Sequence, residues 1–317
     1  MSEPASTMHT AALQMNALSP LLEQELASRF QVYRWFDILD HERFLSEHAG
    51  SIRAVVTGGH IGLPNELLER LPALQIVAIN GVGYDKVDLE AARRRGVCVS
   101  RTAGVLTDDV ADLAVGLVIA LLRGIVSADR LVRGGSWPAG EAPLARKVSG
   151  KRFGIVGLGN IGAAIAARLA AFGPVAYCNR SAKPVPYRFV SSVNELASMS
   201  DVLILAASSN ASTRGMVGRE ILESLGPSGY LVNVARGALV DEAELIAALA
   251  TQRIAGAALD VFIDEPHVPE ALRSAANAVL TPHIASATVE TREAMARAVL
   301  ANLDAFFAGH PVPGAID

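Results

Sequence analysis

A glycine-rich stretch near the middle of the chain has the residue types that cradle a phosphate. It lies between an apolar run at 153–156 and an Ala-rich stretch at 163–172, and it comprises Gly157, Leu158, Gly159, Asn160, Ile161 and Gly162. In a strand–turn–helix setting, such glycines permit the tight turn, the close approach of backbone to a pyrophosphate and the packing of helix on strand. The N–H groups and positive dipole end of the helix then favour phosphate. The motif therefore predicts a dinucleotide site, with residues 158–161 following the pyrophosphate.

The residues about 20 positions beyond the motif indicate which dinucleotide is bound, because NAD-binding chains usually place Asp or Glu there. In this chain an apolar run at 175–178 ends in Asn179, Arg180 and Ser181. No carboxylate is present to repel a 2′-phosphate, while Arg180 can pair with it and its two neighbours can donate hydrogen bonds. The segment favours NADP over NAD. The alternative is that Arg180 is a solvated loop residue, which leaves NAD as the cofactor.

An arginine lies at the end of a later apolar run. Arg236 follows the run at 230–234 and precedes a helical stretch at 242–250. Open parallel sheets bind ligands at the carboxyl ends of their strands, and a planar, permanently charged guanidinium suits a carboxylate or a developing oxyanion. The alternative is a surface arginine that neutralises Asp241 or Glu242.

Two further apolar runs are followed by an acid and a histidine. Glu265 comes after the run at 255–259, and His283 lies just beyond a run that ends at Leu280. A histidine can transfer a proton near neutral pH, and a neighbouring carboxylate would orient it. Each residue alone is more often structural, but their joint placement with the glycine motif at one sheet edge indicates catalysis. His267 lacks the cluster of His, Cys or carboxylate ligands that a metal needs, so we expect no metal.

The elements that position these residues follow from an alternation of apolar runs and helical stretches, which is typical of strand–helix–strand units around parallel sheets. A first series of strands is expected at 54–57, 75–79 and 97–99, with helices at 66–71 and 89–95. A second series is expected at 153–156, 175–178, 202–206, 230–234 and 255–259. Two series predict an α/β protein with two Rossmann-like domains. Residues 134–150 are rich in Gly and Pro and are expected to form an exposed loop.

Length and composition fit an enzyme of two domains. At 317 residues the chain exceeds the usual size of a single core, and a net charge of −4 without a long basic run argues against nucleic acid. Cys98 and Cys178 are expected in the core, in a reducing cytoplasm. Residues 1–10 do not have the pattern of a secretion signal. The stretch at 110–122 is too short to span a membrane, and we expect its own domain and a second subunit to bury it from two sides.

Taken in order, these segments resemble the D-isomer-specific 2-hydroxyacid dehydrogenases over nearly the whole chain. The resemblance rests on the glycine motif and on the segments 80–85, 105–112, 233–237, 260–266 and 281–285. Within that family it is closest to the glyoxylate, hydroxypyruvate and hydroxyphenylpyruvate reductases. Many of these are similar in lacking the carboxylate that selects NAD.

The resemblance implies a discontinuous arrangement of the two domains. Residues 1–102 and 288–317 would form a substrate-binding domain, and residues 103–287 an inserted dinucleotide-binding domain. A helix at 289–307 would return to the first domain, so that the two crossings act as a hinge. The active site would lie between the domains and exclude water on closing.

The resemblance also implies a mechanism for a reductase of 2-keto acids. The substrate carboxylate would be held by the backbone N–H groups of Val82 and Gly83 and by Arg236. Hydride addition makes an alkoxide, whose charge Arg236 would stabilise while protonated His283 donates the proton. Glu265 would hydrogen-bond the far nitrogen of the imidazole.

Other residues are implied to complete the site. Cofactor contacts near the nicotinamide end fall on Thr107, Ala235, Asp260 and Ser286. Trp137 lies where a tryptophan of similar reductases reaches across a homodimer to line the partner's substrate pocket. The alternative is that Trp137 packs on its own domain.

Two other functions are compatible with these residues. One is a dinucleotide-sensing regulator similar to the C-terminal-binding-protein corepressors, which share the fold and work mainly through protein contacts. The other is a dehydrogenase of the same family that acts on phosphoglycerate, formate or phosphite. A turnover assay separates the first from an enzyme, and a substrate panel separates the second.

Overall fold

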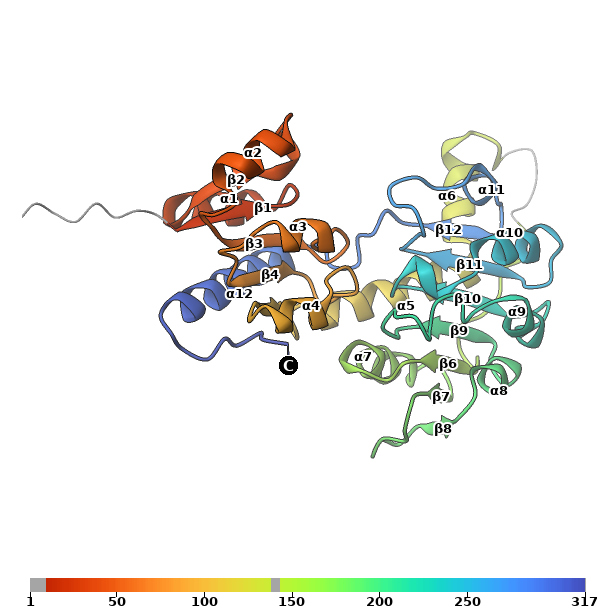
Figure 1. Cartoon of the computed structure of the whole chain (residues 1–317). Coiled ribbons are helices and arrows are strands. Elements are labelled where there is room, and N and C mark those ends of the chain that lie inside the picture. The colour runs from red at the N-terminus through yellow and green to blue at the C-terminus, as the bar shows by residue number, and fades with distance from the viewer. Residues whose placement is uncertain (1–9, 138–142, 317) are drawn as a thin grey trace, which may run out of the picture. The chain divides into compact units, whose positions relative to one another are not determined.

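The computed structural model describes residues 10–137 and 143–316, which form two compact units. The first unit contains residues 1–106 and 288–317, and the second contains residues 107–287. The second unit is thus inserted in the first, and the chain returns to the first unit for its last helix (Figure 1).

The first unit is built on a five-stranded parallel sheet with the strand order β2-β1-β3-β4-β5. Its strands are β1 (Ala11–Gln14), β2 (Gln31–Arg34), β3 (Ile52–Gly58), β4 (Ile76–Asn80) and β5 (Cys98–Arg101). Its helices are α1 (Pro20–Arg29), α2 (His41–His48), α3 (Asn65–Glu69), α4 (Leu89–Arg94) and α12 (Val289–Phe307), with a 3-10 turn η1 (Trp35–Asp37).

Alternation along the strands explains why helices cover both faces of this sheet. Successive side chains of a strand point to opposite faces. Val55 therefore packs with the apolar side chains of α2, α3 and α4, whereas Ala54 and Val56 pack with those of α1 and α12. A sheet buried on both faces needs a nearly continuous apolar run, as in β4, where all five residues are buried and all but the terminal Asn80 are apolar.

The second unit is built on a seven-stranded parallel sheet with the order β12-β11-β10-β9-β6-β7-β8. Its strands are β6 (Phe153–Val156), β7 (Val175–Cys178), β8 (Arg188–Val190), β9 (Val202–Leu205), β10 (Tyr230–Asn233), β11 (Gly256–Leu259) and β12 (Ala278–Leu280). Its helices are α5 (Thr107–Arg123), α6 (Ile125–Arg133), α7 (Asn160–Leu169), α8 (Val193–Ser198), α9 (Arg219–Leu225), α10 (Glu242–Ala250) and α11 (Glu270–Arg273), with a 3-10 turn η3 (Gly237–Leu239).

The strand order of the second unit reverses at β6, which pairs with β9 on one side and β7 on the other. Helices α5 and α7 pack together, and α9 packs with α8 and α10. In open α/β sheets, ligands bind at the carboxyl ends of the strands where the order reverses. The glycine motif follows β6 and therefore begins at this point.

The predicted fold class is confirmed, since both sheets are parallel. The expected elements at 175–178, 242–250 and 289–307 match β7, α10 and α12 at both ends. The elements that were not predicted include all of those before residue 50, the strand β8 and four later helices, namely β1, α1, β2, η1, α2, β8, α6, α8, α9 and α11. The outer strands β2 and β8 carry arginine and exposed positions, because an edge strand needs no continuous apolar run.

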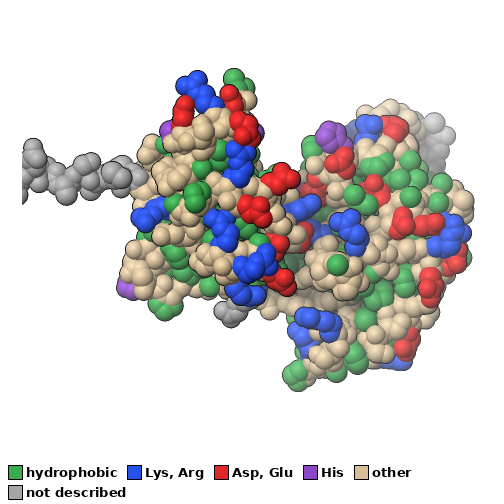
Figure 2. All heavy atoms as spheres, in the orientation of Figure 1, with side chains coloured by type: hydrophobic (Ala, Val, Ile, Leu, Met, Phe, Trp, Pro, Cys, Tyr) green, Lys and Arg blue, Asp and Glu red, His purple; other side chains and the backbone are tan. Residues whose placement is uncertain are grey.

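Helix α5 is buried on one side within its own unit, and burial of its other side by a second subunit stays a prediction. Its buried residues include Val110, Ala114 and Val118, whereas Gly116 is exposed, and a Cβ at that position would meet no heavy atom within 4 Å beyond its chain neighbours and the backbone of its own helix. Among the described residues no single helix is long and apolar enough to cross a membrane; α5 and α6 pass that test only as a pair bent by 63°. Acidic and basic side chains are interspersed on the face shown in Figure 2.

Candidate active site

Each of the three glycines in the motif after β6 is required for a different structural reason. Gly157 has a φ of +91°, and a Cβ there would lie 2.6 Å from the Cα of Ala207. A Cβ on Gly162 would lie 2.0 Å from the carbonyl oxygen of Gly157, so helix α7 packs directly on the turn. Gly159 has open space where a Cβ would be, and no side chain caps the first turn of α7. An exposed backbone and an uncapped helix start fit a dinucleotide pyrophosphate.

The remaining residues of the motif are placed as a phosphate turn requires. Asn160, like Gly159, is exposed at the start of α7, and Ile161 is half-buried. The Leu158 side chain is only 1% exposed, so this residue can offer a ligand its backbone alone.

The segment expected to select the cofactor follows β7, the neighbour of β6. The Gly157 N–H donates to the carbonyl of Cys178 at 2.9 Å, which ties the glycine turn to the end of β7. Asn179 is half-buried, and Arg180 and Ser181 are exposed. Residues 179–181 therefore leave the sheet at its carboxyl edge, next to the glycine motif.

The turn after β10 is braced by a buried asparagine. Asn233 is 1% exposed; its side-chain amide donates to the Arg236 carbonyl at 2.9 Å and accepts from the Ala235 N–H at 3.0 Å. The Arg236 guanidinium donates to the Ala235 carbonyl at 2.7 Å. A Cβ on Gly237 would lie 2.0 Å from the carbonyl carbon of Phe262, so this turn packs tightly against the loop after β11.

The loops after β11 and β12 hold a carboxylate and an imidazole together. Glu265 Oε2 lies 2.6 Å from His283 Nδ1, and Glu265 Oε1 accepts from the Phe262 N–H at 2.9 Å. The side chains are partly exposed, at 33% for His283 and 24% for Glu265. His283 has a φ of +52°, which is uncommon for a residue other than glycine and recurs at functional sites.

Asp260 is the structural centre of the His283 loop, a role that the sequence did not predict. It is fully buried. Its Oδ1 accepts from the Thr281 hydroxyl at 2.6 Å and the Ile284 N–H at 2.9 Å, and its Oδ2 accepts from the Ala285 N–H at 3.0 Å. Charge-assisted bonds of this kind are strong when buried. They hold the loop on both sides of His283.

The other expected site residues are distributed over both units. In the second unit Thr107 begins α5, and Ala235 and Ser286 are half-buried beside the two turns described above. Val82 and Gly83 follow β4 in the first unit. A Cβ on Gly59 would lie 2.7 Å from the Gly83 carbonyl, so the loops after β3 and β4 pack tightly.

Trp137 is 62% exposed, so most of its ring does not pack on the described part of its own unit. The Nδ1 atom of His267 lies 3.9 Å from the Oδ2 atom of Asp264, and both side chains are largely exposed. The described residues contain no group of three or more His, Cys, Asp or Glu side chains arranged to hold a metal ion.

These features define an α/β dinucleotide-binding protein with an arginine, a histidine and a glutamate on neighbouring strand ends. Residues 115–285 match the D-isomer specific 2-hydroxyacid dehydrogenase, NAD binding domain, family. The chain is 49% identical over 302 residues to the hydroxyphenylpyruvate reductase of Plectranthus scutellarioides, covering 95% of this chain and 96% of that protein. It is 48% identical to glyoxylate/hydroxypyruvate reductase A of Arabidopsis thaliana, covering 94% and 96%.

Solved structures are similar over nearly the whole chain. The 2-hydroxyacid dehydrogenase of Ketogulonicigenium vulgare has a TM-score of 0.91 at 41% identity, covering 98% of this chain and 99% of that one. The NADPH-dependent glyoxylate/hydroxypyruvate reductase of Sinorhizobium meliloti, in complex with NADP and malonate, has a TM-score of 0.90 at 38% identity, with 97% of each chain covered. The chain therefore belongs to the D-isomer-specific 2-hydroxyacid dehydrogenase family, and it is an enzyme with a nicotinamide-cofactor domain.

Proposed function

We propose that this enzyme reduces small 2-keto acids, such as glyoxylate or hydroxypyruvate, to D-2-hydroxyacids and prefers NADPH. The observation that carries the proposal is the hydrogen-bonded pair of His283 and Glu265, held on strand ends beside the strand that positions Arg236. Relatives that are named glyoxylate/hydroxypyruvate and hydroxyphenylpyruvate reductases support the substrate class.

The site residues divide the chemistry between them. A bound nicotinamide cofactor supplies the hydride that the reduction needs. Because Glu265 engages His283 at Nδ1, Nε2 is the atom that delivers the proton to the substrate oxygen. Arg236 contributes a permanent positive charge that stabilises the alkoxide as it develops. Val82 and Gly83 contribute backbone N–H groups to the substrate carboxylate.

NADPH preference is assigned to the segment after β7. Arg180 and Ser181 are exposed there, and residues 179–183 contain no carboxylate. An arginine offers a 2′-phosphate charge-assisted hydrogen bonds, whereas a carboxylate would repel it. The NADP bound to the Sinorhizobium meliloti reductase supports this choice.

One steady-state panel tests the proposal. Glyoxylate, hydroxypyruvate and hydroxyphenylpyruvate are each assayed with NADPH and with NADH. We expect turnover of at least one of them and a higher kcat/KM with NADPH. Absence of turnover with all three acids would reject the reductase, and equal kcat/KM with both cofactors would reject the role of Arg180.

The active form is proposed to be a homodimer. Helix α6 has no buried residue, and Ile125 and Val132, seven positions apart on one face, are 50% and 56% exposed. Exposed apolar stripes of this kind mark association surfaces. Trp137 follows the same helix, consistent with a position at the subunit boundary.

A further inference from the structure

The connection between β7 and β8 carries the segment proposed above to bind the 2′-phosphate. The two strands are parallel neighbours, with Cys178 opposite Val190, and residues 179–187 join them without a helix or strand of their own. Parallel neighbours are usually joined by a helical crossover, which holds its own backbone in place. Figure 1 shows this connection extending beyond the sheet. Its conformation therefore depends on individual anchors.

Tyr177 supplies such an anchor from the core of the second unit. It is the third residue of β7, its side chain is 0% exposed, and its ring centroid lies 5.5 Å from that of Phe189. The Lys183 N–H donates to the Tyr177 hydroxyl at 2.7 Å, and that hydroxyl donates to the Lys183 carbonyl at 3.3 Å. A single buried hydroxyl thus holds both backbone polar groups of one loop residue.

These two bonds limit the freedom of the residues that are proposed above to bind the cofactor. Cys178 is fixed in the sheet and Lys183 is fixed by Tyr177, so the four residues between them span two anchored points. Arg180 and Ser181 are exposed on that span. Ordering a loop on binding costs free energy, and a loop already held in the bound conformation avoids that cost.

We infer that Tyr177 is a positioning residue for NADPH, whose hydroxyl holds the backbone at Lys183 so that residues 179–182 present their donors to the 2′-phosphate. The inference rests on the proposed NADPH preference. The rival explanation is that the ring only fills the core, a role that phenylalanine performs equally well. The two explanations differ in the hydroxyl alone.

Tyr177→Phe separates the hydroxyl from the ring. We expect KM for NADPH to rise about five- to tenfold, the effect of losing the short bond from the Lys183 N–H and the longer bond to its carbonyl, with kcat and KM for NADH unchanged. Calorimetric binding of adenosine 2′,5′-bisphosphate should weaken by a similar factor, whereas binding of 5′-AMP should not. Tyr230→Phe is the matched control, because Tyr230 begins β10 at the amino edge of the sheet, and it should leave all five values unchanged.

A double-mutant cycle tests whether the hydroxyl acts through Arg180. In an Arg180→Ala background, Tyr177→Phe should weaken adenosine 2′,5′-bisphosphate binding by less than twofold, because the donor that it positions is already gone. Lys183→Ala keeps the backbone N–H and reports the charge of that side chain separately.

The outcomes distinguish this inference from the function on which it rests. If the unmutated enzyme binds the bisphosphate no better than 5′-AMP, both the NADPH preference and the role of Tyr177 are wrong. If it prefers the bisphosphate and Tyr177→Phe keeps that preference, only the role of Tyr177 is wrong. Equal weakening of both nucleotides by Tyr177→Phe would also overturn it, because general damage to the fold does not discriminate between them.

Discussion

Two carboxylates position His283, and each acts on a different part of the residue. Glu265 contacts the ring itself, at Nδ1, whereas Asp260 contacts the loop that carries the ring, through the Thr281 hydroxyl and the N–H groups of Ile284 and Ala285. One carboxylate therefore orients the imidazole, and the other preserves the backbone conformation from which it projects. Orientation of this precision is what proton transfer requires.

The direction of the pH dependence follows from the proposed role of His283. Only the protonated ring can donate, so single-turnover reduction of the keto acid should slow as pH rises from mildly acidic to alkaline. The reverse oxidation should quicken over the same range. Stopped-flow measurement of NADPH consumption checks this. A reduction rate that stays flat from mildly acidic to alkaline pH would remove His283 from the mechanism.

Replacement of Arg236 tests its electrostatic role. We expect Arg236→Gln to lower kcat/KM by a factor that corresponds to about 3–4 kcal/mol, as for loss of a single donor that stabilises an oxyanion. Affinity for NADPH alone should not change, which fluorescence titration would establish as the control. Unchanged turnover in this variant would show that the guanidinium is not used.

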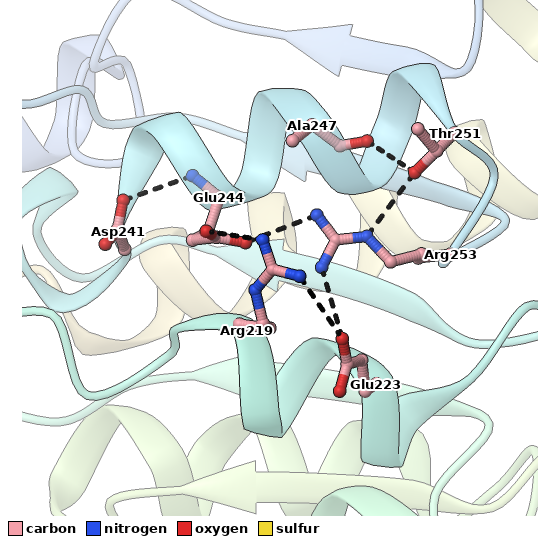
Figure 3. Close-up of polar contacts among 7 residues, drawn as sticks. All are labelled: Arg219, Glu223, Asp241, Glu244, Ala247, Thr251 and Arg253. Carbon is pink, nitrogen blue, oxygen red and sulfur yellow. Dashed lines mark hydrogen bonds and ion pairs between the residues drawn. The ribbon is translucent and has the colours of Figure 1, made fainter.

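At the scale of helices and strands, a network of charged residues joins α9 to α10, the helix that follows the turn carrying Arg236. Figure 3 shows Arg219 and Glu223 of α9 facing Glu244 of α10 and Arg253 just beyond it. Glu244 lies 3.2 Å from both arginines, and Asp241 caps α10 by accepting from the Glu244 N–H. Helix α10 follows the Arg236 turn, so this network stabilises the element next to the site.

Glu244→Ala should lower the free energy of unfolding by about 1–2 kcal/mol, because a carboxylate hydrogen-bonded to two arginines is worth more than an exposed pair. Glu223→Ala is the matched control. Its contacts with the same arginines are longer, at 3.9 and 3.6 Å, and its side chain is 53% exposed against 26% for Glu244. Urea denaturation of both variants measures the two losses of unfolding free energy, and we expect the loss to be larger for Glu244→Ala. Equal losses in the two variants would contradict this prediction.

The starts of β6 and β9 are joined by an ion pair whose strength depends on pH. Partial burial raises the pKa of Asp201, but the Arg152 guanidinium and backbone N–H outweigh it and hold that pKa below its usual value. The two bonds are 2.9 and 2.8 Å long. Because the pKa of Asp201 is lower in the folded protein than in the unfolded chain, its ionised form stabilises the fold. This stabilisation is present when the pH is above the ordinary pKa of an aspartate, and it is lost as the pH falls through the pKa of the folded protein.

Asp201→Asn should therefore be less stable than the unmutated protein near neutral pH, and the difference should shrink as the medium becomes acidic. Denaturation curves of both proteins at several pH values measure it. Asp264→Asn is the control, since Asp264 is largely exposed and should show no such trend. A difference that is constant with pH would rule out the ion pair as its source.

In the molecule as a whole, the insertion of one unit in the other gives each a complete sheet and core of its own. The apolar surface that remains on α6 is not covered by the described part of this chain. It comprises Ile125 and Val132, which are 50% and 56% exposed. Association of two copies would bury it.

Val132→Glu should shift the protein from dimer to monomer, because a carboxylate in an apolar interface is strongly unfavourable. Light scattering coupled to size-exclusion chromatography measures the mass. Val289→Glu is the control at a position that is 74% exposed on α12 in the first unit, and it should leave the mass unchanged. A monomeric unmutated protein would contradict the proposed dimer.

The parallel α/β class and the family could be predicted from the residues alone. Both follow from local patterns: apolar runs of strand length, a glycine turn between strand and helix, and short segments in a fixed order. The glycine motif was predictable because φ and close approach are properties of a few consecutive residues. By contrast, β2 was not predicted, because its four residues begin with Gln31 and end with Arg34 and so form no continuous apolar run.

The side chains that support the site become apparent only in the folded chain. The partners of Asp260 lie more than 20 residues further along the chain, and the hydroxyl of Tyr177 reaches a loop residue that its strand pattern does not identify. Such contacts join loops from different strands, and loop conformation depends on what packs beneath it rather than on its own residue types. Hydrogen-bond partners are set by distances in space, which the order of residues along a chain does not specify.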